Sequence, residues 1–189
     1  MPPISKINFL PMNKIFSNLV LIIFSVVTIS ASCKKEKMGI DGLPAATQTG
    51  ENTFGCMVNE KLFIPNNYSL GKSSLEKSYP LSGLYQYNFQ LEVHRRDGDD
   101  LSNVYISTYA QLREGLTIPL LEVATQGVAS ASYVRNGDYY STTSQNKGEI
   151  KITHFNITNR VISGTFSFDA INKKGEIKQI REGRFDVTF

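Results

Sequence analysis

The sequence predicts an all-β domain, an antiparallel β-sandwich or open barrel of about nine strands, which follows a signal peptide and a flexible tether. Apolar and polar residues alternate from Phe54 onward, with the period of two that is typical of a half-buried strand. Asn, Asp and Gly, which favour turns, separate these runs. Helical periodicity is weak throughout, and only residues 110–114 fit a helical turn.

Residues 1–32 have the pattern of a lipoprotein signal peptide. Lys14 precedes an 11-residue apolar run from Leu19 to Ile29, and the small residues Ser30, Ala31 and Ser32 then lead to Cys33. A spanning helix needs about 20 apolar residues, whereas the apolar part of a signal peptide has about 7–15. We therefore predict cleavage before Cys33 and attachment of lipid to its thiol. The alternative is an uncleaved N-terminal anchor.

The predicted mature chain has the size of a single domain. Removing residues 1–32 from the 189 leaves 157 residues, and the start of translation is left open between Met1 and Met12. The removed segment carries two lysines and no acid, so the net charge falls from +3 to +1. A charge this close to zero gives no basis for nucleic-acid binding. Residues 33–53 are polar and small, which predicts a tether, and residues 54–189 form the β domain.

The first half of the domain begins with a predicted hairpin. Strands at residues 54–58 and 61–64 flank Asn59-Glu60, although Gly more often supplies the positive φ that such a turn requires. Residues 66–83 are rich in Asn, Ser, Gly and Lys and predict a long loop. Residues 84–95 then alternate over a long half-buried strand, which turns at residues 97–100.

The second half continues with shorter strands. Asn136-Gly137 between two β-rich runs is a strong hairpin signal. Pro119 predicts that its strand lies at a sheet edge, and a bulge is expected near Glu182-Gly183. The predicted strands are residues 103–110, 116–125, 129–135, 138–143, 149–157, 161–171 and 176–189.

No set of residues has the spacing of a catalytic or metal site. His94 and His154 each occur alone in a strand, whereas a zinc site needs three or four ligands. Asp97, Asp99 and Asp100 are weak candidates for a calcium site, and the favoured interpretation of this segment is a solvated turn. We therefore predict no cofactor, no metal and no catalytic residue. Cys56, the one cysteine left after lipidation of Cys33, is predicted to be buried in a strand.

Tyrosine is frequent and tryptophan is absent, with 9 and 0 residues respectively. Exposed tyrosines could form a platform for sugar or peptide. Their period-two placement, however, predicts that most of them are core residues or members of cross-strand pairs. Tyr139 and Tyr140 are adjacent in a strand, so one of the two should be exposed.

Both ends of the predicted domain resemble a known family. Residues 52–65, NTFGCMVNEKLFIP, resemble the "N-x-F-G-C-x-V-N-G-x-x-x-x-P" start of a family of uncharacterised lipoproteins from Bacteroidota, with Glu60 in place of the usual Gly. Residues 162–172 and 183–189 resemble its "I-x-G-T-F-x-F-x-A-x-N … G-x-F-x-V" end. The resemblance implies a lipid-anchored β domain and no activity. In such lipoproteins, acidic residues soon after the lipidated cysteine favour display on the cell surface. Residues 34–37 contain only one acid, so the resemblance does not decide between the periplasmic face of the membrane and the cell surface.

We therefore expect a non-enzymatic lipoprotein of the cell envelope, anchored to the outer membrane by its lipid, that binds a protein or glycan partner. One alternative is a hydrolase acting on polysaccharide or envelope, which needs two carboxylates roughly 5–9.5 Å apart. Asp97, Asp99, Glu92 and Glu122 are generic candidates for that pair. A further alternative is an accessory subunit of an uptake or export complex.

Overall fold

The computed structural model describes residues 42–66, 74–83 and 86–189. The predicted signal peptide, the lipidation site Cys33 and Tyr85 lie outside these ranges. The described part contains strands and turns but no α-helix, so the prediction of an all-β fold is confirmed. It follows that no helix in these ranges is long and apolar enough to cross a membrane.

Eleven strands are present in the described part. They are β1 (Thr53–Val58), β2 (Lys61–Phe63), β3 (Leu75–Ser78), β4 (Asn88–Asp97), β5 (Asp100–Tyr109), β6 (Thr117–Leu121), β7 (Ala129–Arg135), β8 (Asp138–Ser141), β9 (Gly148–Asn156), β10 (Val161–Ile171) and β11 (Ile177–Thr188). Strand β3 was not predicted, because it lies in the stretch assigned to a loop. It is short, with a single buried apolar residue, Leu75, and pairing with β4 defines it.

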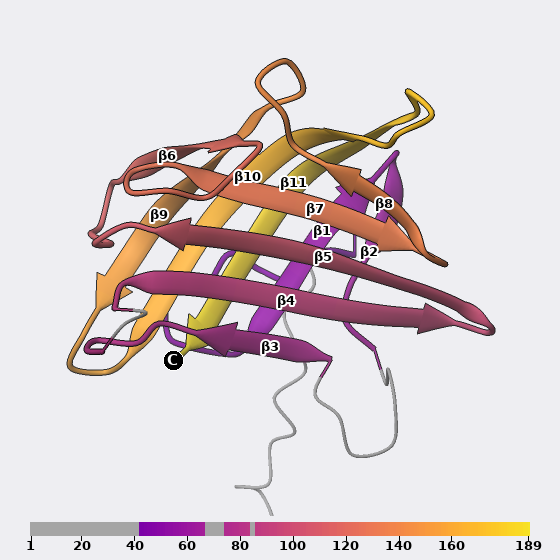
Figure 1. Ribbon diagram of the computed structural model, residues 1–189. Coiled ribbons are helices and arrows are strands. Elements are labelled where there is room, and N and C mark those ends of the chain that lie inside the picture. Colours follow the sequence, from indigo (N-terminus) through magenta and orange to yellow (C-terminus); the bar gives the residue numbers. More distant parts are fainter. Residues whose placement is uncertain (1–41, 67–73, 84–85) are drawn as a thin grey trace, which may run out of the picture. The chain divides into compact units, whose positions relative to one another are not determined.

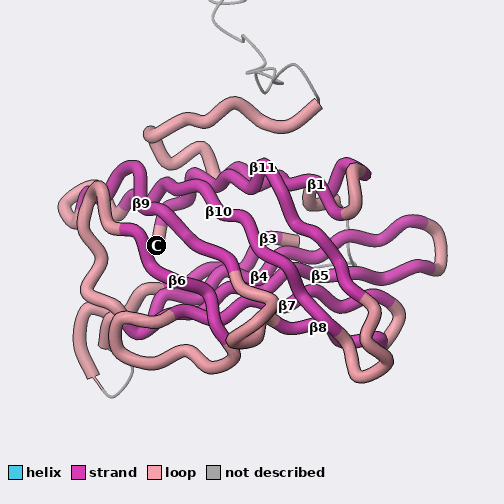
Figure 2. The backbone as a smooth tube through the Cα atoms, turned by 90° about the horizontal axis from the view of Figure 1, so that it is seen from above, coloured by secondary structure: helices cyan, strands magenta, loops and turns pink. Residues whose placement is uncertain are grey.

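The strands form one continuous sheet that folds into two layers. The order is β2-β1-β11-β10-β9-β6-β7-β5-β4-β3, and β8 pairs with both β7 and β10. Figure 1 shows β1, β11, β10 and β9 running obliquely across β3, β4, β5 and β7, and Figure 2 shows the two layers from above. The arrangement is a sandwich joined along one side by β6 and β8.

Pairing is antiparallel except between β6 and β7, so the expectation of a purely antiparallel sheet needs correction. Strand β6 lies between β9 and β7, not at an edge as Pro119 predicted. Pro119 is tolerated because the ladder to β7 begins one residue later, at Leu120, and involves only Leu120 and Leu121. On that side Pro119 therefore stands beyond the end of the ladder.

Aromatic rings fill the space between the layers. Phe89 of β4 packs on Phe185 of β11 at 5.7 Å between ring centroids, and Phe63 of β2 meets Tyr133 of β7 at 6.4 Å. Cys56 belongs to the same core and is 0% exposed, as predicted. Burial raises the pKa of its thiol, because a thiolate there would lose its water.

Both predicted two-residue hairpins are confirmed. Asn136 and Gly137 between β7 and β8 have φ of 50° and 87°. Asn59 and Glu60 between β1 and β2 have φ of 45° and 65°, so Glu60 occupies a left-handed position without being glycine. The predicted bulge in β11 is present as well, because Glu182 has φ of 53° and the register with β10 shifts beside it.

A segment before β1 packs against the outside of the β1-β11-β10 layer. Leu43 is 1% exposed, and a Cβ on Gly55 would come within 2.5 Å of the Pro44 ring, so only glycine allows this approach. Among the described residues, Leu43 and Pro44 therefore already contact the β1-β11-β10 layer before β1 begins. In Figure 2 the loop that precedes β1 lies beside β11.

Asp186 of β11 holds this segment. The carboxylate is 1% exposed and accepts five hydrogen bonds. Its Oδ2 accepts from the Thr47 hydroxyl and from the backbone N–H groups of Thr49 and Glu51, at 2.7, 3.1 and 3.1 Å. Its Oδ1 accepts from the Gly50 N–H and the Ser163 hydroxyl, at 2.8 and 2.7 Å. Burial alone would raise the pKa of Asp186, but these hydrogen bonds outweigh it and the pKa lies below its usual value.

We predict that Asp186→Asn destabilises the protein by about 2–3 kcal/mol at pH 7, because the new amide N–H₂ would face backbone N–H donors. The native carboxylate has a lowered pKa, so its contribution is present above the ordinary value of 3.8 and is lost as the pH falls below it. Urea unfolding at pH 7 and pH 3 measures both effects. The control is Asp169→Asn, which removes a surface ion pair to Arg181 and should cost less than about 1 kcal/mol. Equal costs for the two variants would contradict the prediction.

We predict that Glu60→Gly stabilises the protein by about 0.5–1 kcal/mol, because glycine adopts positive φ without a Cβ clash. Thermal unfolding of the two proteins measures the gain. Lys173→Gly is the matched control, since Lys173 lies in another turn and has no positive φ. That variant should lose stability, and a gain of similar size there would refute the explanation.

Candidate functional site

A groove of about 340 Å³ opens where the β1–β2 hairpin meets the ends of β4, β5 and β7. We call it the hairpin groove. Phe63 and Tyr133, which are in edge-to-face contact, are its most deeply buried lining residues. Its charged lining residues are Lys61, Arg95, Asp97, Asp100, Arg135 and Lys178. The groove thus combines four cations with two carboxylates, and its lining carries a formal charge of +2.

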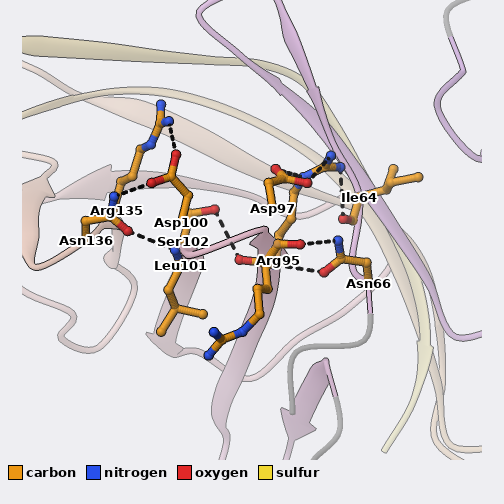
Figure 3. Close-up of polar contacts among 10 residues, drawn as sticks. Ile64, Asn66, Arg95, Asp97, Asp100, Leu101, Ser102, Arg135 and Asn136 are labelled. Atoms are coloured by element: carbon orange, nitrogen blue, oxygen red, sulfur yellow. Dashed lines mark hydrogen bonds and ion pairs between the residues drawn. The ribbon is translucent and has the colours of Figure 1, made fainter.

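Arg95 neutralises Asp97 through a two-pronged contact within β4. Its Nε donates to Oδ2 at 2.6 Å and its Nη2 to Oδ1 at 2.8 Å, while Nη1 reaches the Ile64 carbonyl at 3.5 Å (Figure 3). Arg95 therefore ties the end of β4 to the residue that follows β2. The hydrogen bond from Arg95 is the main reason that the pKa of Asp97 lies below its usual value.

Asp100 is held in the same way by the β7–β8 hairpin. Arg135 Nη2 donates to its Oδ2 at 2.5 Å and Asn136 Nδ2 to its Oδ1 at 2.6 Å (Figure 3). The Asn136 side chain also accepts from the Leu101 N–H at 2.8 Å, which locks the two hairpins together. Donation by Arg135 and then by Asn136 lowers the pKa of Asp100, and Asp100 in turn raises the pKa of Arg135.

The two remaining cations are not paired with either carboxylate of the groove. Lys178 does act on Glu176, whose pKa is lowered first by hydrogen bonds from Tyr140 and Asn172 and in smaller part by Lys178. Among residues that the structure describes, Lys61 and Lys178 form no ion pair, although the Lys178 ammonium lies 5.2 Å from the centre of the Tyr140 ring. Both acids of the groove are already paired with arginine. The lysines are therefore the groups available to an incoming negative charge.

The groove brings two carboxylates together, and each of them is paired with an arginine. A glycosidase needs one carboxyl group that keeps its proton at working pH. The pKa values of Asp97 and Asp100 are both lowered, chiefly by hydrogen bonds from Arg95 and Arg135, which is the opposite direction to that of such an acid. The other generic candidates lie apart from the groove: Asp99 is in the exposed turn, Glu92 is on the outer side of β4 and Glu122 follows β6.

The histidines and the candidate calcium ligands form no metal centre in the described ranges, where no group of three or more His, Cys, Asp and Glu gathers. The Nδ1 atom of His154 in β9 is 3.0 Å from Glu114 Oε2, and the Nε2 atom of His94 in β4 is 3.5 Å from Glu92 Oε1. Asp97 and Asp100 of the proposed calcium set are paired with arginine, and Asp99 makes no such contact.

The cations of the groove are not marked by any motif in the sequence. A signal was nevertheless present, because Lys61, Arg95 and Arg135 each stand beside or close to a hairpin turn. The predicted fold did not say which turns lie at the same end of the sandwich. For that reason, the three residues could not be grouped before the layers were known.

Comparison with known proteins gives a match to one family model over part of the chain and no activity. Residues 99–187 match a protein family described as a domain of unknown function (DUF6252), which covers the part from β5 to β11. No curated protein and no solved structure matches the chain. The match includes Asp100, Arg135 and Lys178 of the groove, whereas Lys61 and Arg95 lie outside it.

Proposed function

We propose that the protein is a non-enzymatic binding protein of the cell envelope, anchored to the outer membrane by lipid on Cys33, which binds an acidic ligand in the hairpin groove. The observation that carries the binding role is the pair of lysines, Lys61 and Lys178, beside carboxylates that are already neutralised by arginine. An acidic group entering the groove would gain two cations without displacing a native ion pair.

Support for the anchor comes from the order of residues before the domain. An apolar run of 11 residues and three small residues precede Cys33, and Leu43 is the first buried residue in the described part of the chain. Nine residues separate Cys33 from Leu43. An extended chain of that length reaches about 30 Å, which is enough to hold the β domain outside the headgroup layer of a bilayer.

Support for a binding role over catalysis comes from the groove itself. Both of its carboxylates are held in the charged state by arginine, and neither histidine lines it. Four positive side chains at its wall suit a ligand that bears carboxylate or phosphate groups.

We predict that the native protein partitions with membranes and incorporates a palmitate analogue, and that Cys33→Ser abolishes both. The serine hydroxyl cannot form the thioether to diacylglycerol, so the chain has no lipid to hold it. Labelling followed by membrane fractionation measures the effect. Cys56→Ser is the control, because Cys56 is buried in the core and should leave labelling unchanged. Membrane retention of the Cys33→Ser protein would contradict the lipid anchor.

We predict that the detergent-solubilised full-length protein binds poly-L-glutamate, and that Lys61→Gln with Lys178→Gln weakens binding about tenfold or more at low salt. The pair Lys173→Gln and Lys174→Gln removes the same charge from a different hollow and is the matched control. Titration with poly-L-glutamate at two salt concentrations distinguishes long-range electrostatic attraction, which salt screens, from direct contact with the two lysines. Equal weakening by both pairs would show that binding follows net charge alone and not the groove.

A further inference from the structure

The outward side of the β4–β5–β7 layer carries polar side chains in register. Gln90, Glu92 and His94 of β4 stand opposite Ser107, Tyr105 and Asn103 of β5. We call these six residues the polar face. The alternate residues of the same strands, among them Phe89, Leu91 and Ile106, are 0% exposed and form the core. Strand β7 extends the rows with Ser130 opposite Ser107 and Ser132 opposite Tyr105.

The polar face is hollowed on both sides of Glu92. One hollow of about 230 Å³ extends toward β3 and is lined by Ser78, Gln90 and Tyr105, among others. The second, of about 420 Å³, extends toward β7 and is lined by His94 and Asn103, among others. Glu92 lines both, so the two hollows adjoin. Together they run from β3 to β7, about 14 Å at the usual spacing of strands.

Acidic and polar side chains meet where the hollows adjoin, and Lys77 of β3 lines the smaller hollow together with Glu76 and Glu92. The Asn103 amide donates to Glu92 Oε1 at 2.9 Å, and His94 Nε2 lies 3.5 Å from the same oxygen. Within the described ranges, Asn103 Oδ1 is buried without a hydrogen-bond partner. Glu76 of β3 stands directly opposite Glu92, a like-charged pair that costs stability. Sugar hydroxyls both donate and accept, so they can bond to the carboxylates and to Lys77. Glu76, Glu92 and Lys77 give the smaller hollow a formal charge of −1, which disfavours an anion.

Tyrosine rings frame the same side of the sheet. Tyr105 is half-buried in the polar face, and Tyr109, four residues along β5, is 40% exposed. Tyr139 of β8 is 58% exposed and stands opposite Val134, which in turn stands opposite Asn103. By contrast, Tyr79, Tyr133 and Tyr140 lie in the core. Three of the tyrosines noted in the sequence are therefore brought to one outward surface.

We propose that the polar face is a binding site for a neutral oligosaccharide. Sugar rings offer hydroxyl donors to the acceptors beside Glu92 and apolar C–H faces to the tyrosine rings. The residues that line the polar face carry no net positive charge. In this respect the site differs from the hairpin groove, for which an acidic ligand is proposed. The inference does not rest on the function proposed for the groove, and either site can fail without the other.

Calorimetric titration of the full-length protein in neutral detergent tests the proposal, with neutral hexasaccharides of glucose, xylose, mannose and galactose as probes. At least one hexasaccharide should bind with a dissociation constant below about 1 mM. Tyr105→Ala should weaken binding about tenfold, and Tyr105→Phe, which keeps the ring, should stay within about twofold of the native protein. The groove pair Lys61→Gln and Lys178→Gln should leave the affinity unchanged.

Tyr139→Ala provides a second probe that does not depend on packing, because this ring is largely exposed and its removal leaves the core intact. It should weaken binding about threefold or more. The proposal is overturned if no hexasaccharide binds below about 1 mM. It is also overturned if both tyrosine-to-alanine variants bind as the native protein does, or if the groove pair abolishes binding.

Discussion

The buried carboxylate of Asp186 joins the beginning of the domain to its end. It lies near the C-terminal end of β11, the strand that pairs with both β1 and β10, and it gathers hydrogen bonds from the segment before β1 and from Ser163 of β10. A charge without solvent is tolerable only when donors replace its water, and five donors do so here. The contact fixes the segment that leads into β1 against β11 and β10, next to the ladder between β1 and β11 that positions the β1–β2 hairpin.

The two surfaces with functional potential arise from one arrangement of strands. Strands β4, β5 and β7 turn their apolar residues toward β11 and β2 and their polar residues outward, which produces the core and the polar face from the same alternation. At the ends of these strands the hairpin turns place charged residues beside the β1–β2 hairpin. The hairpin groove is therefore a property of the ends of the strands, and the polar face is a property of their sides.

Local features of the fold could be predicted from the sequence because they depend on neighbours in the chain. The Asn136-Gly137 turn, the alternation of β10 and the burial of Cys56 are of this kind. Strand β3 and the parallel pairing of β6 could not be predicted, since each depends on a partner far along the sequence. In the sequence, Asp186 stands between Phe185 and Val187, the position of an ordinary polar residue on the outward side of a strand. Only the packing of residues 43–51 over that side makes it a buried acceptor.

The same packing determines how a mechanical load would enter the domain. A force applied to the chain before Leu43 first loads the packing of Leu43, the contact between Pro44 and Gly55, and the hydrogen bonds to Asp186. The ladder between β1 and β11 is loaded only after these contacts. These contacts can yield locally while the sheet keeps its pairing. Tension transmitted along the chain is thus absorbed at the outer surface of the layer, and the strands that shape the groove are spared.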